Sequence, residues 1–253
     1  SQLAGFELAP GATYASEELL LGCFADGLTA LREYALVAAR LRGITPRCDI
    51  PSGWISWYGY RLEVTEQAML DNARIVAERF LPYGADVVQL DFGFEKDFVP
   101  NDSLHACPQR FAHGLPWLSD QLSSMGLRLG LWLCPVLTSS RYSLFVDHPE
   151  YFVRDHSGAP LMFGKWTWGS REPMHVLDPT VPGAMDDPMR QIELMRKATG
   201  CRYWKMDFLA CLMYILEQGC FADSNLIAGM EVYRTAVEAL RRAAGTDYVY
   251  FCS

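Results

Sequence analysis

Short runs rich in β-forming residues alternate with stretches of helical periodicity along most of this chain, and this alternation limits the choice of fold most strongly. The expected strands cover Trp54–Tyr58, Asp86–Phe92, Arg128–Cys134, Tyr203–Phe208 and Tyr248–Cys252. The expected helices cover Thr65–Phe80, Leu115–Met125, Met185–Lys197 and Leu226–Ala243. Strands that alternate with helices in this way predict βαβ units and a parallel sheet.

The central strands are apolar on both faces, as strands buried inside a parallel sheet are. An eight-stranded (β/α) barrel takes about 250 residues, and this chain has 253 residues but only five recognisable strands. We therefore predict an α/β fold of the (β/α)8 TIM-barrel type, incomplete here, with about five of the eight strands and a C-terminal truncation. An open doubly wound sheet is the alternative, but no glycine-rich phosphate turn follows the first strand.

The first fifty residues follow a different pattern. Ser16–Arg42 has one long helical periodicity that ends at Gly43, and a Pro-Ser-Gly break follows at 51–53. We predict that residues 1–50 form the tail of an upstream domain plus a connecting helix. Residues 51–253 are then the N-terminal part of the barrel.

Composition excludes several classes of protein. Hydrophobic residues make up 50% of the chain and charged residues 21%, which is ordinary for a globular domain. A formal net charge of −8 argues against binding to nucleic acid or to an anionic membrane. No apolar run reaches the roughly 18 residues of a membrane helix, and no secretory signal is visible.

Cysteines and histidines do not indicate a metal site. The eight cysteines have irregular gaps without a C-x-x-C pair, and His105 and His113 lack standard ligand spacing. We predict no metal and no cofactor. Reduced thiols are typical of a cytoplasmic protein, which is the predicted location.

Side chains suited to chemistry gather at the carboxyl ends of the predicted strands, where barrels and open parallel sheets carry their sites. They are Trp54, Trp57, Asp91, Trp132, Cys134, Lys205, Asp207, Cys252 and Ser253. Aromatic rings stack on the C–H faces of sugars, whereas carboxylates and lysine bind hydroxyl groups. This set therefore predicts a small-molecule carbohydrate as the partner.

Seven segments in order resemble the catalytic barrel of glycoside hydrolase family 36, the α-galactosidase (melibiase-type) family. They are GWISWYGY, QLDFGFEKD, RFAHGLPWLSDQLSSMGLRLGLWLCP, HPEYFVRDHSG, REPMHVLDP, YWKMDF and FCS. The resemblance covers about four fifths of the chain. It implies a barrel preceded by a β-sandwich domain, and a retaining hydrolase of terminal α-linked galactose.

The resemblance also implies a role for each matching residue. Asp207, the aspartate of Lys-x-Asp, would be the nucleophile that forms a covalent glycosyl-enzyme. The family's acid/base residue follows a sixth strand, beyond Ser253. The implied substrate-binding residues are Asp91, Lys205, Arg171, Trp54, Trp57, Trp132, Cys134, Cys252 and Ser253.

Two residues depart from the family's pattern. Phe92 stands where the family has the second aspartate of a pair that binds galactose, and Cys134 stands where it often has an acidic residue. The loss of one carboxylate at Phe92 puts strict galactose specificity in doubt, and Cys134 predicts a more apolar subsite. An α-N-acetylgalactosaminidase or a transglycosylase of the same clan is therefore one alternative.

Other interpretations of the same residues stay open. Asp207 and Lys205 are two residues apart on a strand and share a face, so they could form a structural ion pair. Lys205 could instead form a Schiff base, as in aldolase-type barrels. A sugar-binding pseudo-enzyme would keep the pocket without the reaction, and a homo-oligomer is compatible with the sequence.

Overall fold

The computed structural model describes residues 10–11, 13, 18–45, 50–169, 171–215, 219–223 and 229–252. Contacts divide the chain into two compact units, Gly5–Ile50 and a larger unit that contains everything from Pro51 onward. The upstream β-sandwich implied by the family resemblance stays a prediction.

The smaller unit contains helix α1 (Gly27–Leu41), and every residue of this helix is at least partly exposed. The helix begins at Gly27 because the Asp26 side chain caps it, accepting the backbone N–H of Thr29 at 2.9 Å. The helical pattern predicted from Ser16 was therefore too long. Within it, residues 18–24 have no regular secondary structure.

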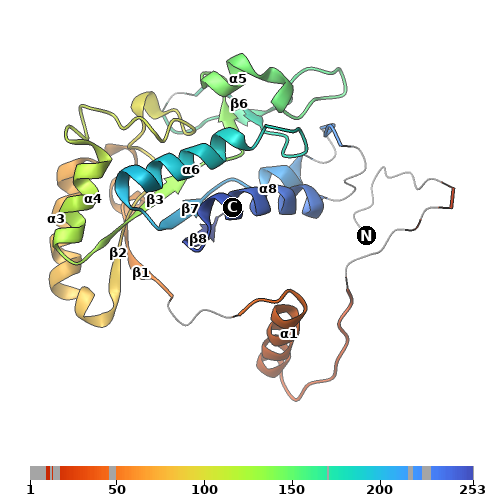
Figure 1. Ribbon diagram of the computed structural model, residues 1–253, viewed down its shortest axis with the longest axis horizontal. Coiled ribbons are helices and arrows are strands. Elements are labelled where there is room, and N and C mark those ends of the chain that lie inside the picture. The colour runs from red at the N-terminus through yellow and green to blue at the C-terminus, as the bar shows by residue number, and fades with distance from the viewer. Residues whose placement is uncertain are drawn as a thin grey trace. The chain divides into compact units, whose positions relative to one another are not determined.

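Five parallel strands form the central sheet of the larger unit, in the order β1-β2-β3-β7-β8 (Figure 1). Their bounds are Ser52–Ile55, Ala85–Leu90, Arg128–Leu133, Tyr203–Met206 and Tyr248–Phe251. Neighbouring strands pair in parallel throughout. The predicted fold class, a (β/α)8-type barrel represented by five strands, is confirmed.

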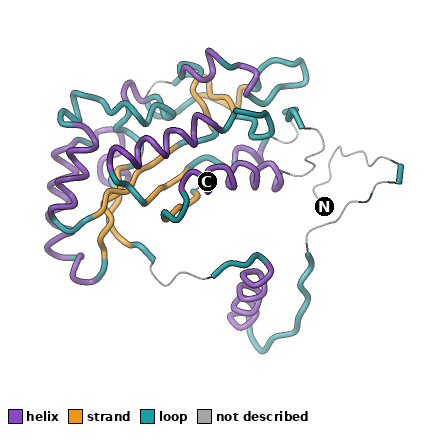
Figure 2. Tube along the Cα trace, viewed as in Figure 1, coloured by secondary structure: helices purple, strands orange, loops and turns teal. Residues whose placement is uncertain are grey.

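Four long helices follow these strands and cover one side of the sheet (Figure 2). They are α3 (Glu66–Arg79), α4 (Gly114–Ser124), α6 (Asp186–Thr199) and α8 (Gly229–Ala244). Consecutive helices contact one another, as in the outer layer of a barrel. Thr65 caps α3, because its hydroxyl accepts the backbone N–H of Ala68 at 3.1 Å. Among the described residues, no helix combines the length and apolar character needed to span a bilayer.

Short elements fill the connections. The short helices are α2 (Trp57–Tyr60), α5 (Ser143–Asp147) and α7 (Cys211–Tyr214), and the 3-10 turns are η1 (Arg61–Glu63), η2 (Leu81–Tyr83), η3 (Lys96–Phe98) and η4 (Pro149–Tyr151). The first strand was predicted to reach Tyr58, but β1 ends at Ile55 and α2 begins two residues later. Ser56 between them is fully buried.

A second, three-stranded sheet lies between β3 and α6 in the sequence, where the sequence analysis predicts neither a strand nor a helix. It consists of β4 (Leu137–Ser139), β5 (Met162–Lys165) and β6 (Pro173–Val176), in the antiparallel order β4-β6-β5. Strands of three and four residues are too short to give a periodic signal, so sequence patterns did not reveal this inserted sheet.

A buried carboxylate joins helix α6 of the helical layer to the last two strands of the central sheet. Asp247, before β8, accepts hydrogen bonds from the indole of Trp204 at 3.0 Å and from Arg196 of α6 at 2.8 Å. Trp204 in β7 is fully buried. Because a buried charge needs partners to offset its lost hydration, this contact fixes how β7, α6 and the start of β8 pack together.

We predict that Gly53→Ala destabilises the barrel unit. A Cβ on Gly53 in β1 would lie 1.8 Å from the carbonyl oxygen of Val87, so β1 must move away from β2. We expect a loss of about 2 kcal/mol or more in the free energy of unfolding, as for an overpacked site. Gly59→Ala is the matched control, because a Cβ there meets no atom within 4 Å. Urea denaturation of both variants measures the difference, and equal stabilities would contradict the predicted clash.

Candidate active site

One ammonium group and two carboxylates meet at the carboxyl ends of β2 and β7. The Nζ of Lys205 donates to Oδ2 of Asp91 at 3.0 Å and lies 3.7 Å from Oδ2 of Asp207. Asp91 directly follows β2, whereas Lys205 lies within β7 and Asp207 follows that strand. The sequence prediction that these three residues lie together is therefore confirmed in space, although their roles stay predictions.

Asp91 is almost fully buried and is held from several directions. Its Oδ2 accepts the side-chain amide of Gln89 at 2.9 Å, and its Oδ1 accepts the backbone N–H of Phe92 at 3.0 Å. Its own backbone N–H donates to the hydroxyl of Ser56 at 3.0 Å. Burial raises the pKa of Asp91 above its ordinary value, although Lys205 acts in the opposite direction.

Lys205 keeps its proton. Burial alone would lower the pKa of this lysine, but the neighbouring carboxylates of Asp91 and Asp207 outweigh it, and the net effect is a raised pKa. A Schiff-base lysine needs a neutral amine to attack a carbonyl carbon. The contacts of Lys205 therefore disfavour the aldolase-type alternative.

The carboxylate of Asp207 is oriented by two donors. The indole Nε1 of Trp132 in β3 donates to Oδ2 at 3.1 Å, and the backbone N–H of Phe208 donates to Oδ1 at 2.9 Å. Phe208 has a φ angle of 62°, which is unfavourable for a bulky residue. A tight turn thus follows β7 and leaves Asp207 partly exposed at the strand end.

Aromatic rings enclose these charged groups in a pocket with an empty volume of about 340 Å³, including the part open to solvent. The aromatic lining residues are Trp57, Phe92, Trp132, Trp166, Trp168 and Phe208. Many of the rings touch: the centroid of Phe92 lies 5.1 Å from that of Trp132 and 5.2 Å from that of Trp166. Such a pocket offers ring faces to an apolar surface and charged groups at one side.

Trp166 and Trp168 are pocket residues that the sequence analysis missed. Both follow β5 of the inserted sheet, far along the chain from any end of a central strand. Trp166 packs edge-on against Phe208, with centroids 5.3 Å apart, and Trp168 packs edge-on against Trp57 at 5.6 Å. The only sequence signal was the concentration of tryptophan in the long segment between β3 and α6.

Two predicted residues line a neighbouring cavity instead. Trp54 and Cys252 border a space of about 660 Å³ together with Tyr58 and Tyr250, and Lys205 borders both this space and the pocket. Burial, followed by the nearby charge of Asp207, raises the pKa of the Cys252 thiol. Ser253 lies outside the described residues.

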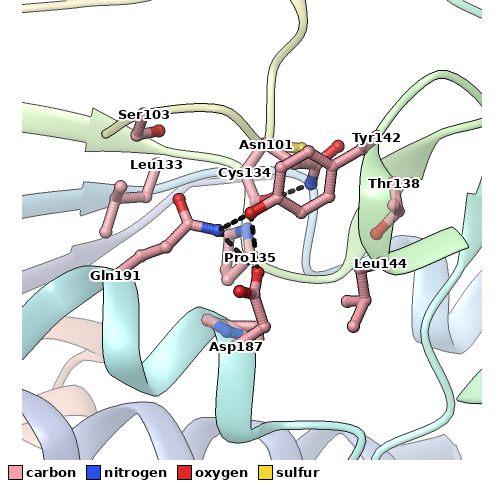
Figure 3. A pocket seen from close by; sticks show the side chains of 11 residues that line it. Asn101, Ser103, Leu133, Cys134, Pro135, Thr138, Tyr142, Leu144, Asp187 and Gln191 are labelled. Atoms are coloured by element: carbon pink, nitrogen blue, oxygen red, sulfur yellow. Dashed lines mark hydrogen bonds between the residues drawn. The ribbon is translucent and has the colours of Figure 1, made fainter. Parts of the chain in front are cut away.

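Cys134 and Arg171 do not line the pocket around Asp207. Cys134 borders a separate cavity beside Tyr142, Asp187 and Gln191, whose side chains hydrogen-bond to one another (Figure 3). Its Sγ donates to the carbonyl oxygen of Leu137 at 3.2 Å, and burial raises its pKa. Arg171 is exposed and is absent from the described lining of the pocket. Neither residue lines this pocket, and their predicted contact with the sugar stays a prediction.

A buried glutamate supports the segment that carries Asp91 and Phe92. Oε2 of Glu95 accepts the backbone N–H of Gly93 at 2.9 Å, whereas Oε1 has no hydrogen-bond partner in the described part of the chain. The guanidinium of Arg110 donates to the carbonyl oxygens of Leu62 and Gly93, which joins this segment to the one after β1. Burial raises the pKa of Glu95 well above its ordinary value.

Comparisons of sequence and of structure both find similarity to α-galactosidases. No model of an established protein family matches the chain. It is similar to the α-galactosidase TtGalA of Thermus thermophilus, solved with p-nitrophenyl α-D-galactopyranoside, with 29% identity and a TM-score of 0.63 over 86% of this chain and 41% of that one. The fold is also similar to that of the family 36 α-galactosidase AgaA of Geobacillus stearothermophilus, with 20% identity and a TM-score of 0.57 over 81% of this chain and 28% of that one.

Curated sequences agree with the structures. The bifunctional α-galactosidase/sucrose kinase AgaSK of Mediterraneibacter gnavus is 25% identical over 63% of this chain and 17% of that protein. For three other curated α-galactosidases the chain spans between 16% and 22% of the relative's length. These matches cover only part of each relative.

The strand order and the charged strand ends define the class of fold, a (β/α)8-type barrel with charged groups at its strand ends. Within that class, the chain is similar in sequence to α-galactosidases and similar in fold to those of glycoside hydrolase family 36. The resemblance predicted from the seven sequence segments is confirmed.

We predict that Glu95→Gln becomes more stabilising, relative to the native protein, as the pH rises. The raised pKa means that the folded state keeps the proton of Glu95 at pH values where the unfolded chain has released it. Stability contributed by this group is therefore present below the unfolded pKa near 4.5 and is lost as the pH rises towards the folded pKa. Glutamine has no such proton to lose.

Urea unfolding at pH 4, 6 and 8 measures this effect. The difference in unfolding free energy between Glu95→Gln and the native protein should grow by about 1 kcal/mol or more across that range. Glu193→Gln serves as the matched control, because Glu193 is exposed on α6. A difference that stays constant with pH would show that Glu95 is ionised in the folded state.

Proposed function

We propose that the protein is a retaining α-glycosidase that acts on terminal α-linked galactose or a closely related sugar, with Asp207 as the nucleophile. The observation that carries this proposal is the Lys205 ammonium between two carboxylates, at the strand ends of a barrel, inside a pocket walled by aromatic rings. The similarity to TtGalA, solved with an α-galactoside, supports the choice of sugar.

The proposed reaction proceeds in two displacements. An oxygen of Asp207 attacks the anomeric carbon, the bond from that carbon to the leaving oxygen breaks, and a carboxylic acid protonates the departing oxygen. A water molecule then attacks the same carbon and loses a proton to that acid's conjugate base, and the bond to Asp207 breaks. By resemblance, the acid/base residue follows a sixth barrel strand.

The contacts of Trp132, Asp91 and the pocket tryptophans indicate what each contributes to the proposed reaction. Trp132 orients the attacking carboxylate through its indole N–H, which fixes the direction of attack. Asp91 is already shared between Lys205 and Gln89, which suits it to accept hydroxyl groups of the sugar rather than to transfer protons. Trp57 and Trp168 then offer ring faces to the C–H surface of the sugar.

We further propose that residues 1–50 connect the barrel unit to an upstream domain. Contacts divide the chain close to this position, and α1 has no buried residue of its own. A helix of 15 residues without buried side chains gains little stability by itself, which supports a connecting role.

An α-galactose-configured covalent inactivator tests the proposed nucleophile. We expect digestion and mass spectrometry to find the adduct on Asp207, since the inactivator traps the glycosyl-enzyme. Asp207→Asn should give no adduct, whereas Asp71→Asn, at an exposed position on α3, should be labelled like the native protein. An adduct on another residue, or none while TtGalA is labelled in parallel, would overturn the assignment.

The rate of labelling tests the role of Trp132. We predict that Trp132→Phe slows labelling by about tenfold or more, because it removes the hydrogen bond that orients Asp207 but keeps an aromatic ring. Trp204→Phe removes a similar buried bond to Asp247 on the other side of the sheet. That control should lower thermal stability and leave the labelling rate of the folded protein unchanged. Equal rates for the two variants would show that Trp132 does not position the nucleophile.

A further inference from the structure

The pocket is polar on one side and apolar on the other. Asp91, Lys205 and Asp207 supply its charged groups, and the six remaining lining residues are all aromatic. Among the described residues, the corner formed by Phe92, Trp132 and Trp166 is built entirely of rings, with centroids 5.1 and 5.2 Å from that of Phe92. Phe92 directly follows Asp91, so the change from polar to apolar occurs within one residue of the chain.

This corner offers a ligand no free hydrogen-bonding atom. The indole N–H of Trp132 is already donated to Asp207. The indole nitrogen of Trp166 has no partner in the described structure, but that atom has almost no accessible surface and cannot be reached from the pocket. A hydroxyl group placed here would lose its hydrogen bonds to water without replacement, which is unfavourable.

The polar side of the pocket can accept few further hydrogen bonds from a ligand. Three hydrogen bonds already reach the carboxylate of Asp91, from Gln89, Lys205 and the backbone of Phe92. A carboxylate has about four acceptor sites, so Asp91 has room for roughly one hydroxyl. A galactoside carries four hydroxyl groups besides its anomeric oxygen, so Asp91 cannot accept all of them, and a hydroxyl group that lies at the apolar corner finds no partner there.

We propose that Phe92 selects a sugar whose exocyclic carbon carries no hydroxyl group: a 6-deoxy sugar of galactose configuration, linked in the α form. The exocyclic carbon is the only carbon of the sugar at which loss of the hydroxyl leaves a methyl group that projects from the ring. A methyl group against Phe92, Trp132 and Trp166 gains contact with rings and loses no hydrogen bond. This inference rests on the proposed function, because it assumes that the pocket holds the sugar that reacts with Asp207.

Two probes that differ by one oxygen atom test the inference. They are methyl α-D-galactopyranoside and methyl 6-deoxy-α-D-galactopyranoside, whose binding to the intact protein is measured by calorimetry or ligand-observed NMR. We expect the deoxy sugar to bind at least tenfold more tightly, about 1.4 kcal/mol. Because binding needs no chemical step, this measurement does not depend on the acid/base residue.

A pair of variants isolates the polarity of residue 92. Phe92→Leu keeps the corner apolar and should retain the preference, whereas Phe92→Asn, of similar size to leucine, should reduce it to threefold or less. Circular dichroism checks that both variants are folded, and the comparison in the native protein stands even if one of them is not.

The possible outcomes distinguish a failure of the proposed selection by Phe92 from a failure of the proposed glycosidase function. Equal binding of the two sugars, or tighter binding of the galactoside, overturns the selection by Phe92 and leaves the proposed glycosidase function intact. Binding of neither sugar also overturns it, and if the covalent inactivator then fails to label Asp207, the proposed function fails too. A retained preference in Phe92→Asn would show that another part of the pocket selects the deoxy sugar.

Discussion

The contact of Lys205 with Asp91 and Asp207 is the interaction on which the rest of the site depends. One ammonium offsets two carboxylates, and it joins the ends of β2 and β7 across the intervening strand β3. Taking charges out of water is costly, and removal of one partner leaves the others uncompensated. The site therefore holds its geometry only as a unit. A lysine that bridges two carboxylates also stays protonated, which favours electrostatic and binding roles over nucleophilic ones.

Alternate residues of strand β7 face the buried core and the candidate site. Trp204 and Met206 are fully buried, and Trp204 points to Asp247 and α6, whereas Lys205 between them points to the pocket. Successive side chains on a strand face opposite sides, so one four-residue strand anchors the helical layer and positions the charged centre. The two faces of β7 thus contribute separately to stability and to the charged centre.

The inserted sheet supplies two aromatic residues that help to close the pocket at the ends of the central strands. Parallel strands present charged groups at their ends, but they do not by themselves enclose a ligand. Trp166 and Trp168, which follow β5, close the pocket over Phe92 and Phe208. The charged centre therefore comes from the central sheet, together with four of the six aromatic lining residues, and the inserted sheet adds Trp166 and Trp168.

The sequence by itself determined the five central strands, the four long helices and the charged strand ends, because these follow from local periodicity and from the rule that parallel strands end at one edge of a sheet. It also carried the family resemblance. Only the tertiary structure decided which aromatic residues enclose the pocket: Trp166 and Trp168 enter it, whereas Trp54 borders another cavity. It also placed Cys134 in the lining of another cavity, beside Tyr142, rather than in the lining of the pocket around Asp207. The physical reason is that such placements depend on contacts between residues far apart in the chain, which no local pattern records.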